Sequence, residues 1–205
     1  ILPWASILTF IALILFSINV LMSVRNSTKR NYSAKFIKTS IFWLFLTALI
    51  GLALAGNHMH TFLDPTSFKF LKIHAHFGIA GWFLQLIMGV ASVLIPMFLV
   101  SHALDEKKLK IAYNFVNAGL TLLAIEWFLE SDGSFRPVFV GIMVIGVLAF
   151  LSYLRDAYKK KLRKLDIGMK LTTVALVAIA IPIILGLIIS LSRYFGNSFS
   201  SNLSA

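Results

Sequence analysis

The chain alternates long apolar runs with short polar, mostly basic segments. Each run is long enough to cross roughly 30 Å of hydrocarbon as a helix, which takes about 20 residues. No extended alternation of apolar and polar positions occurs, so the pattern predicts helices rather than strands. We therefore expect an all-α fold, a polytopic transmembrane bundle of six helices forming a single domain over residues 1–205. The predicted helices cover residues 2–24, 39–57, 71–100, 110–129, 136–154 and 170–192.

The composition is typical of a membrane protein, and the distribution of charge predicts its orientation in the membrane. Of the 205 residues 59% are hydrophobic and 13% charged, and the net charge is +11. Only Lys69, Lys72, Arg136 and Arg193, of the 19 basic residues, lie outside the first, third and fifth loops. Basic residues favour cytoplasmic loops, so we expect these loops in the cytoplasm and both termini on the outer side, in a bacterial inner membrane. We expect the partner of this positive charge to be a lipid bilayer rather than nucleic acid. We also expect the fifth loop to contact anionic lipid.

The third run begins with two histidines, in the stretch Ile73-His74-Ala75-His76-Phe77-Gly78-Ile79-Ala80-Gly81-Trp82. An imidazole near hydrocarbon needs a partner for its nitrogens, so it marks a functional site by default. At roughly 100° per residue, His74 and His76 point to opposite faces of the helix, and each requires its own partner. The stripe below His74 holds only small or polar residues and predicts close approach of a helix or a flat ligand: Gly78, Gly81, Gln85, Gly89, Ser92 and Pro96. The stripe below His76 is apolar.

The spacing of these residues resembles a known family. His-x-His-x-Gly-x-x-Gly-Trp, with Gly89 seven residues after Trp82 and Pro96 seven after Gly89, is similar to the tenth helix of subunit I of the haem-copper oxidases, most of all the cbb-type branch. The resemblance covers residues 74–96 without a gap. It implies that His74 ligates a high-spin haem and His76 a low-spin haem, both of b type.

The same resemblance implies parts that this chain lacks. A haem-copper centre needs three copper histidines and a second axial histidine on helices that precede this segment, and the chain holds five histidines in all. We do not expect copper to be bound by this chain alone. The sequence does not begin with methionine, and we expect residue 1 to lie inside a longer protein, whose missing half or other membrane subunits are the expected partners.

The remaining candidates carry weaker signals. His58 and His60 follow the helix-ending pair Gly56-Asn57, and they are solvated loop residues, axial haem ligands or copper ligands. Lys69 and Lys72 serve as interfacial lysines or, by the resemblance, neutralise haem propionates. His102, beside Asp105 and Glu106, is expected at the surface. The chain has no cysteine, which excludes disulfides, thiolate ligation and iron–sulfur clusters.

The predicted spans also contain one acidic residue and two pairs of residues that affect helix packing or shape. Glu126 is the only acid within a predicted span, and we expect it near the interface, with proton transfer or a hydrogen bond to a ligand histidine as the alternatives. Gly141 and Gly146 predict close helix packing in the fifth span. Pro182 and Gly186 predict a kink in the sixth.

Three functions remain open. The first is a haem protein similar to part of oxidase subunit I, working in respiratory electron transport or in reduction of oxygen or nitric oxide; whether the chain is itself an enzyme, and through which catalytic residues, stays open. The second is a non-catalytic structural or accessory subunit that keeps the helix scaffold. The third, a histidine-based transporter of protons or metal, lacks the paired broken helices common in that class.

Overall fold

The computed structural model describes residues 2–25, 31–57, 60–63, 68–129 and 133–203. Every regular element in these residues is helical, as the hydropathy pattern predicts, and none is a strand. The helices form two compact units, residues 1–91 and residues 92–205. The expectation of one domain over the whole chain stays a prediction.

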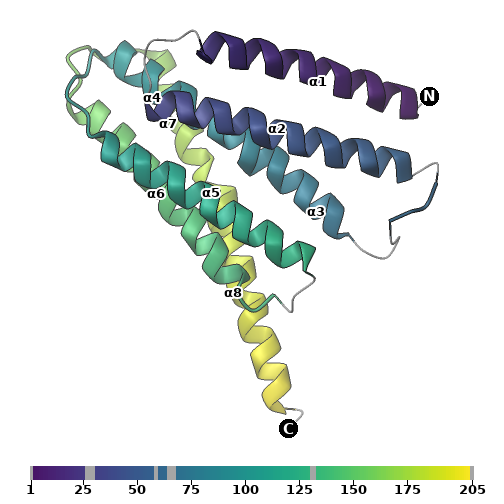
Figure 1. The fold of residues 1–205 in the computed structure, drawn as a ribbon. Helices are drawn as coiled ribbons and strands as arrows, with labels where there is room; N and C mark the ends of the chain where they lie inside the picture. The colour runs from purple at the N-terminus through teal and green to yellow at the C-terminus, as the bar shows by residue number, and fades with distance from the viewer. Residues whose placement is uncertain (1, 26–30, 58–59, 64–67, 130–132, 204–205) are drawn as a thin grey trace. The chain divides into compact units, whose positions relative to one another are not determined.

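The first unit begins with two long helices that lie side by side (Figure 1). Helix α1 covers Leu2–Arg25 and α2 covers Tyr32–Asn57. Helix α2 starts seven residues before the predicted 39, because the side chain of Asn31 accepts a hydrogen bond from the Ala34 amide at 3.1 Å. An asparagine at this position satisfies an amide that the first helical turn leaves without a partner.

The predicted third helix is present but is not uniform. It consists of α3 (Lys69–His76), the π-helix η1 (Phe77–Leu84) and α4 (Gln85–Leu99), which continues into the second unit. Helix α2 packs against both α3 and η1.

The second unit contains the end of α4 and the helices α5 (Glu106–Phe128), α6 (Arg136–Lys159), α7 (Ile167–Ala178) and α8 (Ala180–Leu203). The carboxylate of Asp105 caps α5 by accepting from the Lys107 amide at 2.9 Å, so α5 begins before the predicted residue 110. Helices α5 and α6 pack along their lengths, and α6 also packs against α8.

Glycines set the α5–α6 contact. A Cβ on Gly146 would lie 2.8 Å from the Val116 amide nitrogen, so the close packing predicted there is confirmed. The same prediction is wrong for Gly141, where no atom of another helix in the described residues lies within 4 Å of the Cβ position. The structure adds Gly119, whose Cβ would lie 2.7 Å from the Phe139 carbonyl oxygen.

The predicted sixth helix is divided. Helix α7 ends at Ala178, and α8 starts at Ala180. Pro182 lacks the amide hydrogen that would bond to the carbonyl four residues earlier, which explains the interruption. The interruption lies close to Pro182, and the kink predicted from Pro182 and Gly186 stays a prediction.

The described residues contain six helices or helix combinations that are long and apolar enough to cross a membrane. Large apolar side chains remain exposed along them, for example Trp4 (74%), Ile79 (68%) and Ile188 (55%). Such surfaces are unfavourable in water and favourable in hydrocarbon. The chain is a multi-pass membrane protein.

Candidate functional site

The histidine pair lies on the last turn of α3, directly before the π-helix. His74 is half-buried, whereas His76 is exposed. Their ring nitrogens meet different groups, His74 on α2 and His76 on its own helix. The two imidazoles therefore have separate surroundings, as their spacing predicts.

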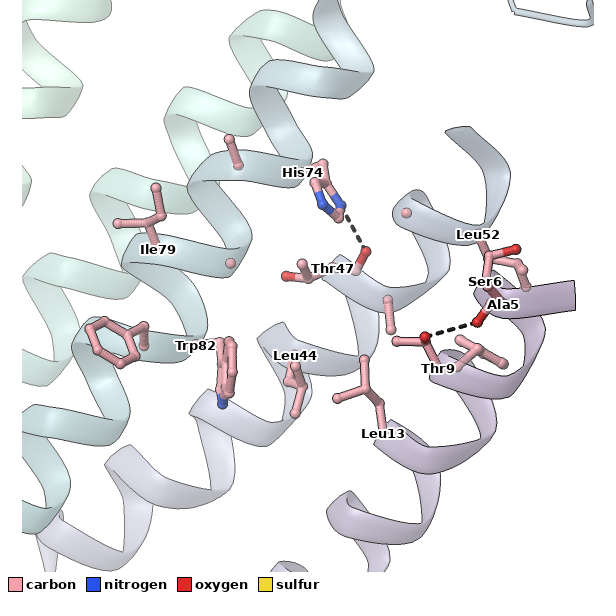
Figure 2. A pocket seen from close by; sticks show the side chains of 16 residues that line it. Ala5, Ser6, Thr9, Leu13, Leu44, Thr47, Leu52, His74, Ile79 and Trp82 are labelled. Atoms are coloured by element: carbon pink, nitrogen blue, oxygen red, sulfur yellow. Dashed lines mark hydrogen bonds between the residues drawn. The ribbon is translucent and has the colours of Figure 1, made fainter. Parts of the chain in front are cut away.

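His74 is held by the main chain of α2. Its Nδ1 lies 3.0 Å from the carbonyl oxygen of Thr47 (Figure 2). A carbonyl oxygen can only accept, so Nδ1 carries the hydrogen and donates it. In the neutral ring Nε2 then keeps its lone pair, which is the form that binds a metal.

Gly51, one turn after Thr47 on α2, makes room for this ring. A Cβ on Gly51 would lie 2.9 Å from Cε1 of His74, closer than carbon atoms normally approach. The imidazole therefore fits against α2 because residue 51 has no side chain. Thr47 and Gly51 are the two residues that the sequence analysis missed. Their spacing of four places them on one helix face, which is the signal that could have revealed them.

His76 has the same tautomer as His74, but its hydrogen-bond acceptor lies on its own helix. Its Nδ1 lies 2.8 Å from the carbonyl oxygen of Lys72, four residues earlier in α3. The ring donates to this oxygen and keeps the Nε2 lone pair. Both histidines are thus oriented by main-chain carbonyls, the second contact that metal-bound histidines commonly make.

The π-helix continues the site along the small-residue stripe. In η1 the hydrogen bonds join residues five apart, a rare geometry that often marks functional sites. Cβ positions on Gly78 and Gly81 would lie 3.3 Å from the Thr47 side chain and 2.7 Å from that of Trp43. Of the two partners predicted for this stripe, a helix or a flat ligand, the structure shows a helix, α2.

A cavity of about 680 Å³ lies beside His74, between α1, α2 and the α3–η1 segment (Figure 2). This volume falls in the range of roughly 300–1,000 Å³ that holds small ligands and cofactors. Its lining is largely apolar, with His74 as the ionisable member. The lining includes Ala5, Thr9 and Leu13 of α1, Leu44, Thr47 and Gly51 of α2, and Gly78, Ile79 and Trp82 of η1.

Two polar groups of the cavity wall differ in how they are satisfied. The hydroxyl of Thr9 donates to its own helix, to the Ala5 carbonyl at 2.8 Å. The indole nitrogen of Trp82 is buried and has no hydrogen-bond partner among the described residues.

The other predicted histidines do not join this site. His58 lies outside the described residues. His60 is exposed in the connection after α2, where the Asn57 side chain accepts from the Phe62 and Leu63 amides, each at 2.8 Å. Its role as a ligand stays a prediction. His102 is exposed, in line with the expected surface position.

Glu126 is buried against other parts of the protein, at 5% exposure. Its expected depth near the membrane interface stays a prediction. Its Oε1 lies 3.7 Å from Nε of Arg136, at the start of α6. Gly133, with φ of +85°, packs against the guanidinium of Arg136 and leaves room for it. The signal for this pair was in the sequence, since Arg136, one of the four basic residues outside the basic loops, faces the only acid inside a predicted span.

Within the described part of the chain, no group of three or more His, Cys, Asp or Glu side chains is placed to share one metal ion. The Nδ1 atoms of His74 and His76 contact different main-chain carbonyls, those of Thr47 and Lys72, so any role as a ligand would fall to one nitrogen of each ring. A planar cofactor that supplies its own four equatorial ligands would need only that one nitrogen from a histidine.

No family model, curated protein or solved structure matches the chain. The resemblance to oxidase subunit I therefore remains a resemblance of motif.

Proposed function

We propose that the chain is a haem-binding membrane protein, similar to part of oxidase subunit I, with a role in respiratory electron transfer or in the reduction of oxygen or nitric oxide. One observation carries the proposal: Nδ1 of His74 and Nδ1 of His76 both donate to main-chain carbonyls. Each ring is thereby fixed in the tautomer that presents Nε2 to iron.

The cavity beside His74 supports a cofactor of this kind. It is large enough for a cofactor, mainly apolar, and bordered by three helices. Such a lining excludes water and lowers the local dielectric, which tunes the potential of a bound iron. A haem there would supply one-electron chemistry, while the chain would hold it through His74 and pack it against α1 and α2.

His76 would hold a second haem on the opposite face. Because His76 is exposed in this chain, the rest of that haem's surroundings would come from a partner. We propose other membrane subunits, or an amino-terminal half, as that partner and as the source of further ligands. The proposed setting is a bacterial inner membrane with both termini on the outer side.

The visible spectrum of the purified chain tests the proposal. We expect a Soret band, and we expect His74→Ala and His76→Ala each to remove part of it, because each change deletes one iron ligand. A pyridine haemochrome assay would report the haem type and the haem-to-protein ratio. His102→Ala, at an exposed histidine outside the site, is the matched control and should leave the spectrum unchanged.

A glycine pair makes the test sharper without touching a ligand. Gly51→Ala should displace the His74 ring and lower haem content, whereas Gly141→Ala adds a methyl group where there is open space and should not. If the purified chain takes up no haem in the presence of excess cofactor and stays folded, the proposal is wrong.

A structural or accessory role is the second candidate. The hydrogen bond from His74 to Thr47 also joins α3 to α2, which a scaffold without cofactor would need. A colourless chain in which His74→Ala lowers the unfolding temperature would favour this function.

A further inference from the structure

The segment of residues 159–170, which runs from the end of α6 through the connection to the first turn of α7, has a surface that haem binding leaves unexplained. It carries six exposed basic side chains: Lys159, Lys160, Lys161, Arg163, Lys164 and Lys170. The expected topology explains why basic residues are concentrated here. It does not explain the hydrogen bonds and the arrangement of side chains in this segment.

The backbone of this connection is fixed within the second unit. The Leu162 amide donates to the Leu99 carbonyl at 3.1 Å, and the ammonium group of Lys160 donates to the Ala103 carbonyl. At the far end, the carboxylate of Asp166 caps α7 by accepting from the Met169 amide at 2.8 Å. The side chains between these contacts therefore form a surface with a defined arrangement.

The carboxylates near this surface are already engaged. Asp156 is paired with Lys108 at 2.5 Å, and Asp166 serves as the cap of α7. Lys161, Arg163, Lys164 and Lys170 form no ion pair within the part of the chain that the structure describes. Four cations are thus available to an external anion.

Two apolar side chains accompany the cations. Leu162 is 75% exposed and Ile167 is 76% exposed, and both lie between basic residues. Helices α6 and α7 belong to two candidate membrane spans, so the connection between their ends lies at a membrane surface. At that depth apolar side chains reach the acyl chains while lysine and arginine meet the phosphates.

We infer that this surface, defined by Lys161, Leu162, Arg163, Lys164, Ile167 and Lys170, binds anionic phospholipid of the surrounding bilayer. The cations pair with the headgroup phosphates, and Leu162 and Ile167 contact the acyl chains. The mixture of charge and apolar surface favours a lipid over a soluble polyanion, which would leave both apolar side chains in water. The inference is independent of the proposed function.

Spin-labelled lipids test it on the full chain. The protein is reconstituted in phosphatidylcholine bilayers with a trace of spin-labelled phosphatidylglycerol or spin-labelled phosphatidylcholine, and electron paramagnetic resonance measures the motionally restricted fraction of each. The unmodified chain should prefer phosphatidylglycerol. The triple change Lys161→Gln, Arg163→Gln and Lys164→Gln should lower that preference at least about fivefold, and salt should lower it in the unmodified chain.

Three controls decide the interpretation. Exchanging the same residues as Lys161→Arg, Arg163→Lys and Lys164→Arg keeps the charge and should keep the preference. Removing charge elsewhere, with Lys35→Gln and Lys38→Gln, should change it much less. The pair Leu162→Ser and Ile167→Ser keeps every charge and should weaken lipid binding, but not the binding of soluble polyphosphate.

Two results would overturn the inference. One is equal restriction of both spin-labelled lipids by the unmodified chain at low salt. The other is a triple variant that has an unchanged unfolding temperature and retains the full preference for phosphatidylglycerol.

Discussion

Pro96 leaves one carbonyl of α4 without its helical donor, and a tyrosine from another helix supplies the replacement. Pro96 has no amide hydrogen, so it cannot bond to the Ser92 carbonyl four residues earlier. The hydroxyl of Tyr153, on α6, donates to that oxygen at 3.1 Å. Both residues are buried, and an unsatisfied carbonyl is costly in an apolar environment.

This contact gives a prediction at the residue scale. Tyr153→Phe should lower the free energy of unfolding by about 0.5–1.5 kcal/mol, because it removes the hydrogen bond from the tyrosine hydroxyl to the Ser92 carbonyl. With Pro96→Ala the residue 96 amide can bond to Ser92, so Tyr153→Phe should be less costly in that background. Thermal unfolding of the four proteins in one detergent measures the coupling.

Tyr194→Phe, at a residue that is 45% exposed, is the matched control and should have little effect. Equal effects of Tyr153→Phe with and without Pro96 would contradict the explanation, since the tyrosine would then act through packing alone.

The histidine site shows what single residues can reveal in a sequence. The spacing of His74 and His76 was enough to predict separate surroundings, because helix geometry fixes the angle between neighbouring side chains. Their hydrogen-bond acceptors were not both predictable. The acceptor for His76 is local, in Lys72, whereas the acceptor for His74 is Thr47, 27 residues away on another helix.

Among the elements, the π-helix η1 is the feature that the apolar pattern concealed. Periodicity indicated a continuous helix over residues 71–100, yet the backbone changes its hydrogen bonding between Phe77 and Leu84. Hydropathy depends on which side chains are apolar, and this is nearly the same for α- and π-helices over two turns. The stripe of small residues was predicted and α2 is its partner, but the change in helix type became visible only in the structure.

The α5–α6 hairpin yields a prediction for an element pair. Gly119→Ala and Gly146→Ala place a methyl group against the main chain of the opposite helix, which cannot move as a flexible side chain can. Each should destabilise the chain by about 1–3 kcal/mol, the usual cost of overpacking. Unfolding of purified variants by heat or denaturant provides the measurement.

Gly141→Ala lies on the same helix α6 as Gly146 and meets no atom within 4 Å. It should be neutral or slightly stabilising, since alanine favours helices over glycine. If Gly141→Ala lowered the stability as much as Gly146→Ala, glycine flexibility, rather than close approach of α5, would be what matters in α6.

At the scale of the whole molecule, the distribution of basic residues predicts the orientation in the membrane, which can be measured directly. The chain has no cysteine, so a single introduced cysteine reports its own position without background. Lys107→Cys and Lys164→Cys should react with a membrane-impermeant maleimide only from the cytoplasmic side. His60→Cys should react only from the outer side.

The critical result of that labelling is whether successive loops react from opposite sides of the membrane. Reaction of His60→Cys and Lys164→Cys from the same side would mean that α3 and its neighbours do not cross the membrane as the six apolar segments require. Lys38→Cys, in the first turns of α2, serves as a third position that is expected on the cytoplasmic side.

The sequence by itself determined the class of this protein, its six membrane-spanning segments and the divergence of its two central histidines. Each of these depends on length, hydropathy or local helix geometry, which act within a few turns of one segment. Only the tertiary structure decided that Gly51 and Thr47 receive His74, that Glu126 is buried beside Arg136, and that Gly146 but not Gly141 is a contact. These depend on which helix face meets which, and that is settled by packing between residues far apart in the chain.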